Sequence, residues 1–365
     1  MAISMIHFSQ KLFSLLSHEA KRSERCGTVD EARMRLNFSE EEKDLFSSIK
    51  NTRRIEVDDF DFVLSYSCKK GEKYLIVSKR LGYAVDPLDK ELVFKQPSLV
   101  DLGVLFKENL LSVAEDVNPD AVLNAIEIYE DNEDYEGNTY DDISCFFPQF
   151  SVYQVNADSK IADSNDEYCL YAYYLIKCHR YGYSNYVGDT LNLYEKTLLS
   201  QLRIPYRNIA SALSSTQWAF RFLETYRLIE HMFPITYMSK LRTNGIIGSP
   251  IEIAKLLENV IDWRPNEQDA VFAIIEEIKL DPKIRTILIQ MKKVIINDNT
   301  KIGKWYYTQV RNQIVHYRAI HKNVSFSSEE WNVILQFNLL LIMYLYTKYD
   351  TYVVAWNTVS DNLGN

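Results

Sequence analysis

The sequence lacks any run of 18 or more apolar residues, although 47% of its 365 residues are hydrophobic. A transmembrane helix needs about 20 such residues in succession, so no membrane span is expected. Residues 1–22 contain apolar positions, but they have neither a basic leading region nor a small-residue cleavage site, which makes them a poor secretory signal. These absences favour a globular protein of the cytoplasm that has no membrane partner.

The sequence contains few cysteines, and they are not spaced as pairs. The number of cysteines is odd and no C-x-x-C pair occurs among Cys26, Cys68, Cys145, Cys169 and Cys178. This usage agrees with a reducing compartment and argues against a structural zinc site. We expect isolated buried thiols. His179 follows Cys178 but has no third ligand nearby, so no metal is expected there either.

The sequence also has no glycine-rich phosphate loop, no internal repeat and no low-complexity tract. An acidic segment at residues 130–142 contains no Lys or Arg. It lacks the ligand order and the fixed glycine of a calcium-binding loop, which favours a solvated acidic segment over a metal site. A further alternative is that this segment folds against a basic surface of the same chain as a nucleic-acid mimic.

Charge is divided unevenly along the chain, whose formal net charge is −9. From Ile204 onward there are 18 Lys and Arg against 15 Asp and Glu, which leaves a net charge of −12 for the preceding part. Residues 282–322 contain a single acid, Asp298, and nine bases: Lys283, Arg285, Lys292, Lys293, Lys301, Lys304, Arg311, Arg318 and Lys322. A local positive field of this kind favours an anionic partner such as nucleic acid.

The first part of the chain mixes helix and strand signals. Ser39 and Glu42 form a capping box at the start of a helix. Residues 60–68 and 73–78 alternate like two strands of a hairpin, with a further strand at residues 92–94. Helices are expected to begin at Pro97 and at Pro119. These signals predict an α+β N-terminal domain over residues 1–205 with a small antiparallel sheet.

Residues 168–186 are unusually rich in tyrosine. The tyrosine rings could stack on unpaired RNA bases. The interpretation we favour is an amphipathic helix whose tyrosine rings are buried while their hydroxyls reach water.

Helix start signals recur regularly from Ser211 onward, at Ser214–Thr216, Ser249–Pro250, Asn266, Asp281–Pro282 and Ser327. The connections between the expected helices are short, as in an antiparallel bundle, and the last helix is expected to end near Trp356. The fold class is therefore mainly α, with an all-α helical domain over residues 206–365. The boundary between the two domains is expected near Pro205 or Ser211.

Residues 301–322, KIGKWYYTQVRNQIVHYRAIHK, combine a helical pattern with the positive charge described above. Apolar residues recur with helical spacing at Ile302, Tyr306, Val310, Ile314 and Tyr317. At about 100° per residue, Asn312 and His316 lie about 200° and 240° from Val310, and Arg311 lies on the flank. The pattern predicts an α-helix that buries one face and presents Arg311, Asn312 and His316 on another.

These three side chains suit metal-free cleavage of RNA. The histidine pKa is about 6.5, so His316 can transfer the 2′-hydroxyl or leaving-group proton. Arg311 can stabilise charge on the phosphoryl oxygens, and Asn312 can orient the imidazole or bind phosphate. His316 follows Arg311 by five positions, which places the two side chains about 140° apart around a helix. A two-fold dimer would overcome this separation by lining one cleft with both pairs.

The R-N-x-x-x-H run near the penultimate helix resembles the signature of the HEPN superfamily, in which Arg and His are separated by four to six residues. The resemblance covers about residues 211–356, where the helix FLETYRLIEHMF is similar to that family's first helix. It implies a metal-independent, dimeric endoribonuclease, often of bacterial toxin–antitoxin, abortive-infection or CRISPR-linked defence systems. One branch of HEPN toxins has His-x-Tyr where this chain has His316-Tyr317-Arg318. This departure argues against the HepT-type toxin branch, and the chain resembles Apea-like abortive-infection proteins instead.

The resulting prediction is an endoribonuclease with catalytic residues Arg311, His316 and Asn312 and with no cofactor or metal. Substrate RNA is expected to contact Lys304, Arg318, His321 and Lys322. Glu224, Glu230 and His231 are candidates for residues that support the site from the upstream helix.

Three alternatives remain open at this stage. The helical domain could be a non-catalytic HEPN-like module that binds RNA or a protein, or a helical interaction protein without nucleic acid. Arg311 and His316 could also be ordinary solvated residues of a basic helix. The N-terminal domain is expected to sense a trigger, restrain the nuclease or hold a regulatory or antitoxin partner.

Overall fold

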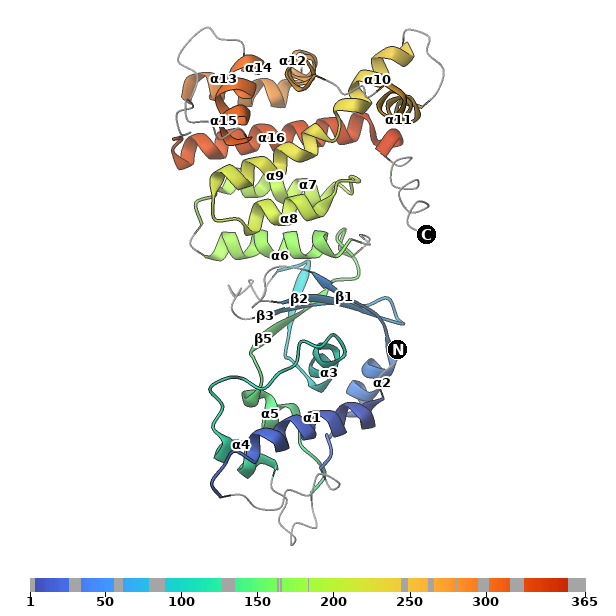
Figure 1. Ribbon diagram of the computed structural model, residues 1–365, viewed down its shortest axis with the longest axis vertical. Coiled ribbons are helices and arrows are strands. Elements are labelled where there is room, and N and C mark those ends of the chain that lie inside the picture. Colours follow the sequence, from blue (N-terminus) through green and yellow to red (C-terminus); the bar gives the residue numbers. More distant parts are fainter. Residues whose placement is uncertain are drawn as a thin grey trace. The chain divides into compact units, whose positions relative to one another are not determined.

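The computed structural model of the chain describes residues 4–25, 34–55, 62–78, 89–126, 135–162, 164, 166–182, 184–243, 249–261, 266–279, 281–294, 302–315 and 325–353. The chain forms two compact units, Met1–Glu167 and Tyr168–Asn365. All the strands of the described residues lie in the first unit, and the described part of the second unit is helical (Figure 1). The expectation of a mainly helical protein with a small antiparallel sheet in its N-terminal part is confirmed.

The boundary between the units differs from the one expected near residue 205. Helices α6 (Glu167–Tyr181) and α7 (Gly188–Leu199) precede that position, and both lie almost entirely in the second unit. Helix α7 packs against the long helix α16 (Ser328–Lys348), a contact between residues far apart in sequence. Long-range packing of this kind leaves no mark on local composition, so the sequence did not reveal it.

The first unit contains one five-stranded antiparallel sheet with the strand order β1-β2-β3-β5-β4. The strands are β1 (Ile49–Ile55), β2 (Val63–Cys68), β3 (Lys73–Ser78), β4 (Leu92–Lys95) and β5 (Phe150–Val155). Strands β2 and β3 form the expected hairpin, with Tyr66 opposite Tyr74 and their rings stacked 4.7 Å apart. Gly71 has φ of 85°, a conformation that favours glycine, in the turn between them.

Helices cover one face of the sheet and share its core. They are α1 (Met5–Ala20), α2 (Glu40–Ser48), α3 (Leu99–Lys107), α4 (Pro119–Ile126) and the short α5 (Tyr140–Ile143). Buried residues of α1, α3 and α4, such as Phe8, Leu102 and Val122, form one apolar cluster with Leu64 and Ile76 of the sheet. The unit therefore has an apolar core between these helices and the sheet.

Helix starts in this unit follow capping side chains. The Ser39–Glu42 capping box of α2 is present as predicted, and α4 begins at Pro119. The start expected at Pro97 was wrong, because α3 begins at Leu99 after a capping box formed by Ser98 and Asp101. A serine whose side chain meets the first turn fixes a helix start more strongly than a nearby proline does.

The second unit is a helical bundle (Figure 1). Besides α6, α7 and α16, it contains α8 (Tyr206–Ser214), α9 (Trp218–Glu230), α10 (Phe233–Thr243), α11 (Pro250–Ile261), α12 (Glu267–Ile278) and α13 (Pro282–Val294). The starts predicted at Ser249–Pro250, Asn266, Asp281–Pro282 and Ser327 are confirmed, each with a side-chain cap. Helix α16 ends at Lys348, before the end expected near Trp356, which lies outside the described residues.

Helix α16 lies at the centre of the bundle and packs against α7, α9 and α13. It is buried on nearly all sides, and its buried residues include two asparagines, Asn332 and Asn338. Asn338 accepts a hydrogen bond of 2.8 Å from the Tyr306 hydroxyl and donates one of 2.8 Å to Thr225 Oγ1. These bonds satisfy polar groups that would otherwise be costly to bury.

The tyrosine-rich helix α6 differs from its prediction. Ten consecutive residues, Cys169–Cys178, are buried, so no face of the helix is exposed to solvent over this stretch. Tyr173 and Tyr174 are only 1% exposed. The expectation that the hydroxyls of these tyrosines reach water was wrong, and neither ring is accessible for stacking on a base.

Within the described residues, no helix has the length and apolar character required to cross a bilayer. Cys68, Cys169 and Cys178 are buried and Cys145 is exposed, while Cys26 lies outside the described residues.

Candidate functional site

The predicted site helix consists of three short pieces, each with its own geometry. Residues Ile302–Trp305 form α14, Tyr306–Arg311 form a π-helical turn named η3, and Asn312–Val315 form α15. The continuous α-helix expected here is therefore wrong at its centre. π-helical turns inside α-helices are rare and occur frequently at functional sites.

The π-turn explains why Arg311 points inward. Hydrogen bonds in such a turn join residue i to residue i+5, so Tyr306 and Arg311 come close to the same face. An α-helix would separate them by about 140°. Tyr306 is fully buried and Arg311 is only 6% exposed. The expectation that Arg311 lies on an accessible flank was wrong, because it assumed α-helical phase throughout.

Helix α12 supplies the main partner of Arg311. The guanidinium forms an ion pair with Glu267, the first residue of α12. Gly303 in α14 permits the close approach of the two helices, because an added Cβ would lie 3.0 Å from a ring carbon of Phe272 in α12. A larger residue at this position would push α14 away from α12, and with it the turn that carries Arg311.

Neighbouring side chains complete the surroundings of the guanidinium. Arg311 Nη1 donates a hydrogen bond of 3.0 Å to Asn312 Oδ1. Its central carbon lies 5.5 Å from the ring centroid of Tyr307 and 5.9 Å from that of Tyr226. Contacts of this length are compatible with cation–π attraction. The Tyr226 hydroxyl is buried and has no hydrogen-bond partner within the described part of the chain.

A second carboxylate lies beside this ion pair. Burial raises the pKa of Glu230, at the end of α9, and the negative charge of Glu267 raises it further, while Arg311 lowers it. Glu267 lies close enough to Glu230 and to Tyr307 for its negative charge to raise the pKa of both groups. We call Arg311, Asn312, Glu267, Glu230, Tyr226 and Tyr307 the Arg311 cluster. It combines one cation, two carboxylates and two phenol rings in a largely buried environment.

The three residues proposed from the upstream helix have different surroundings. Glu230 belongs to the Arg311 cluster. Glu224 forms an ion pair with Arg227 one turn away and accepts a hydrogen bond from Asn208. His231 Nδ1 lies 3.0 Å from the Tyr346 hydroxyl, and burial lowers the pKa of this histidine. Only Glu230 is placed to influence Arg311.

The other predicted site residues fall into two groups. Asn312 is half-buried beside Arg311, and Lys304 is exposed on α14. His316, Arg318, His321 and Lys322 lie outside the described residues. The geometry therefore joins Arg311 to Asn312 but leaves the pairing of Arg311 with His316 a prediction.

Several of the predicted basic residues are on a solvent-facing helix. Lys283, Arg285 and Lys292 are exposed on α13, whose residues Pro282–Val294 include no acid. Together with Lys304, they give the second unit exposed positive charge that suits a polyanion. In the described residues, no group of three or more His, Cys, Asp or Glu side chains could hold a metal ion.

The sequence reasoning missed Glu267, Tyr226 and Tyr307. Glu267 follows the cap Asn266 and has the ordinary appearance of an acidic first-turn residue. Nothing in its neighbourhood connects it to Arg311, because the pairing depends on how α12 packs against α14. A buried arginine requires a partner of opposite charge, which is the one general reason to search for such a carboxylate.

Comparison with known proteins adds no relative to this description, since no protein-family model, no curated protein and no solved structure matches the chain.

Proposed function

We propose that this protein is a metal-independent endoribonuclease of the HEPN type, acting as a dimer in a bacterial defence or toxin system. The observation that carries the proposal is the π-turn that ends at Arg311 and holds it in a polar cluster directly before Asn312. π-helical turns within α-helices are rare and occur frequently at functional sites, so this distortion favours a functional role for the segment. Exposed Lys283, Arg285, Lys292 and Lys304 provide charge for RNA.

In the proposed reaction the 2′-hydroxyl of RNA attacks the adjacent phosphorus and the 5′-oxygen leaves. His316 transfers a proton, and Arg311 stabilises the negative charge that develops on the phosphoryl oxygens. A phosphate presents two oxygens much as a carboxylate does, so substrate would replace Glu267 as the partner of the guanidinium. Asn312 then keeps the Arg311 side chain oriented during this exchange. Both copies of the pair would line one cleft across a two-fold axis.

Phosphate contacts away from the reacting atoms are assigned to Lys304, Arg318, His321 and Lys322, with the exposed face of α13 extending the same positive surface. The N-terminal unit would sense a trigger, restrain the nuclease or hold a regulatory partner. No cofactor is required by this scheme.

A second candidate is a non-catalytic module that binds RNA or a protein through the same basic residues. The burial of Arg311 and its ion pair with Glu267 favour this alternative, because they give Arg311 a structural role in fixing α12 to the π-turn. This alternative predicts salt-sensitive RNA binding from which intact RNA is recovered.

The decisive experiment incubates total RNA with the purified full chain, in buffer with EDTA, and compares the wild type with His316→Ala and Arg311→Ala. We expect cleavage by the wild type and a loss of at least a hundredfold in both variants, since general acid–base groups contribute about 10²–10⁴ in rate. Arg227→Ala is the matched control, because Arg227 is an exposed arginine of α9. RNA that stays intact with wild type but binds to it would instead support the second candidate.

A folding check accompanies this experiment. Arg311→Ala leaves Glu267 without its partner and can unfold the second unit, so its melting temperature is measured beside its activity. His316→Ala, together with an Arg311→Lys variant that keeps the charge, separates loss of chemistry from loss of fold. Cleavage undiminished in His316→Ala would refute the assignment of this residue.

A further inference from the structure

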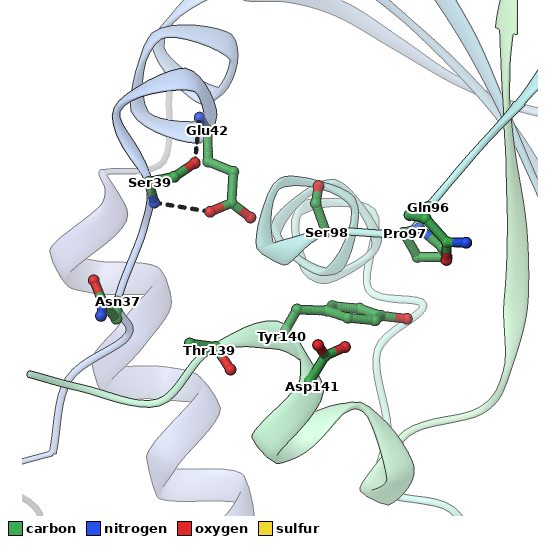
Figure 2. Close-up of a pocket in the computed structure, with 9 residues that line it drawn as sticks. All are labelled: Asn37, Ser39, Glu42, Gln96, Pro97, Ser98, Thr139, Tyr140 and Asp141. Carbon is green, nitrogen blue, oxygen red and sulfur yellow. Dashed lines mark hydrogen bonds between the residues drawn. The ribbon is translucent and has the colours of Figure 1, made fainter.

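A cavity of about 510 Å³ lies in the first unit, at the place where three helices begin (Figure 2). Its volume is in the range of small-molecule sites, which is about 300–1,000 Å³. Helices α2, α3 and α5 start at its edge, and their N-caps Ser39, Ser98 and Thr139 belong to its wall. The residues that line it are Asn37, Ser39, Glu42, Gln96, Pro97, Ser98, Thr139, Tyr140 and Asp141.

Backbone N–H groups at helix starts attract anions, and acidic side chains of the protein accept hydrogen bonds from four of them here. Glu42 Oε2 accepts a hydrogen bond of 2.9 Å from the Ser39 N–H, and Glu42 Oε1 accepts one of 3.0 Å from the Leu99 N–H of α3. One carboxylate therefore serves two helix starts. The N–H groups of Ser98 and Thr139 bond in the same way to Asp101 and Asp142. Four of the N–H groups that an anionic ligand could use are therefore already bonded to carboxylates.

Two of the hydroxyls in the wall also use their protons internally. Ser98 Oγ donates a hydrogen bond of 2.8 Å to Asp101 Oδ2, and Thr139 Oγ1 donates one of 2.7 Å to Asp142 Oδ2. A hydroxyl has one proton and two lone pairs. The oxygen atoms of these residues can therefore only accept hydrogen bonds from a ligand in the cavity, so a complementary ligand must bring N–H or O–H donors.

Charge in the wall has one sign. Glu42 and Asp141 are acidic, and no lysine or arginine is among the lining residues. The Asp141 carboxylate is exposed and has no hydrogen-bond or ion-pair partner among the residues described. Burial raises the pKa of the Tyr140 phenol to about 12, and the charges of Asp101 and Asp141 contribute to the same shift. The negative charges of Asp101 and Asp141 both act on the Tyr140 phenol, and negative charge in the wall favours a cation.

We propose that this cavity binds a small organic cation, an amine or guanidinium compound whose N–H groups bond to the acceptors in its wall and whose charge lies beside Asp141 and the Tyr140 ring. The Tyr140 ring offers a cation its π-face, and the carboxylate of Asp141 offers a charge-assisted hydrogen bond. The volume fits an organic molecule, and the described residues contain no set of ligands for a metal ion. This binding does not depend on the proposed RNA cleavage.

Isothermal titration calorimetry of the full chain with agmatine and with spermidine tests the proposal, with inorganic phosphate and glucose as comparison probes. We expect the two cations to bind with a Kd below about 1 mM and the comparison probes not to bind. Asp141→Asn should weaken binding about tenfold, because it removes the charge but not the shape. Asp116→Asn is the matched control, since Asp116 is exposed in the same unit but outside the cavity.

A second variant fills the site with a charge of its own. Gln96 is exposed at the wall, so Gln96→Lys can be introduced without disturbing the core, and its ammonium group would compete with the ligand. We expect Gln96→Lys to abolish binding and the neutral Gln96→Met to retain it. The proposal is overturned if neither cation binds the wild type, if phosphate binds instead, or if Asp141→Asn and Gln96→Lys bind as the wild type does.

Discussion

Replacing Glu267 by glutamine tests the contribution of the Arg311 ion pair to stability. The side chains of Arg311 and Glu267 are 7% and 33% exposed, respectively. Removing one partner of a fully buried pair costs about 3–5 kcal/mol, because the remaining charge stays buried without compensation. One third of Glu267 is in contact with water, which screens the pair and lowers its contribution. We therefore expect Glu267→Gln to lower the free energy of unfolding by about 1–3 kcal/mol.

This loss is large enough to measure by thermal unfolding. For a unit of this size, 1 kcal/mol corresponds to a change in Tm of about 2–4 °C, so a decrease of about 2–12 °C is expected. Glu276→Gln is the control on the same helix, because Glu276 forms an exposed pair with Lys279. That variant should stay within about 1 °C of the wild type. Equal Tm values for Glu267→Gln and Glu276→Gln would refute the energetic role given to the Arg311–Glu267 pair.

The same variant separates the two roles of Arg311. If substrate phosphate replaces Glu267, then Glu267→Gln frees the guanidinium and should strengthen RNA binding severalfold despite the lower Tm. If Arg311 acts only as a structural anchor, RNA binding should stay constant or fall. The double variant Glu267→Gln with Arg311→Met removes both charges, and its stability should recover partly, because an apolar replacement of a buried pair is often tolerated.

Two further predictions concern buried polar groups. Burial raises the pKa of Asp101 from 3.8 to about 6, so the folded protein binds the proton more tightly than the unfolded chain does. The stabilisation of the folded protein by protonated Asp101 is therefore fully present below about pH 4 and is lost as pH rises through about 6. Urea unfolding across this pH range gives the difference in the free energy of unfolding between the wild type and Asp101→Asn. This difference should fall by about 3 kcal/mol as pH rises, and a constant difference would contradict the burial of an ionisable group. Asn338→Leu should lower the free energy of unfolding by about 2–4 kcal/mol, because Tyr306 and Thr225 lose their buried partner. The exposed Asn192→Leu should change it by less than about 1 kcal/mol in the same denaturation assay.

Local chemistry made much of the fold predictable from sequence. The starts of α2, α12 and α16 each depend on a side chain that bonds a backbone N–H three residues later, at Ser39, Asn266 and Ser327. The β2–β3 hairpin was likewise predictable, because its turn contains a glycine between two alternating runs. Such signals extend over a few residues, so they can be read without knowledge of the tertiary structure.

Features that depend on distant contacts were not predictable in this way. The tyrosine hydroxyls of α6 were expected to contact water. The spacing of the tyrosines does not reveal that residues 169–178 are buried throughout. Arg311 was assigned an accessible flank from a period of 3.6 residues, which the π-turn does not follow. Glu267 is close to Arg311 only because α12 and α14 pack together.

The two buried asparagines of α16 have a consequence for how this helix can slide. Helix α16 is apolar on nearly every side, so apolar contacts alone would tolerate a displacement by one turn, about 5.4 Å, along its axis. Asn332 is bonded to Thr190, Val187 and Asn185, and Asn338 is bonded to Tyr306 and Thr225. A displaced helix would leave both amides buried without these hydrogen bonds, together with the buried side chains of Thr190, Thr225 and Tyr306. The asparagines therefore define a single axial position for α16. Because Tyr306 is bonded to Asn338, this position also fixes where the π-turn places Arg311.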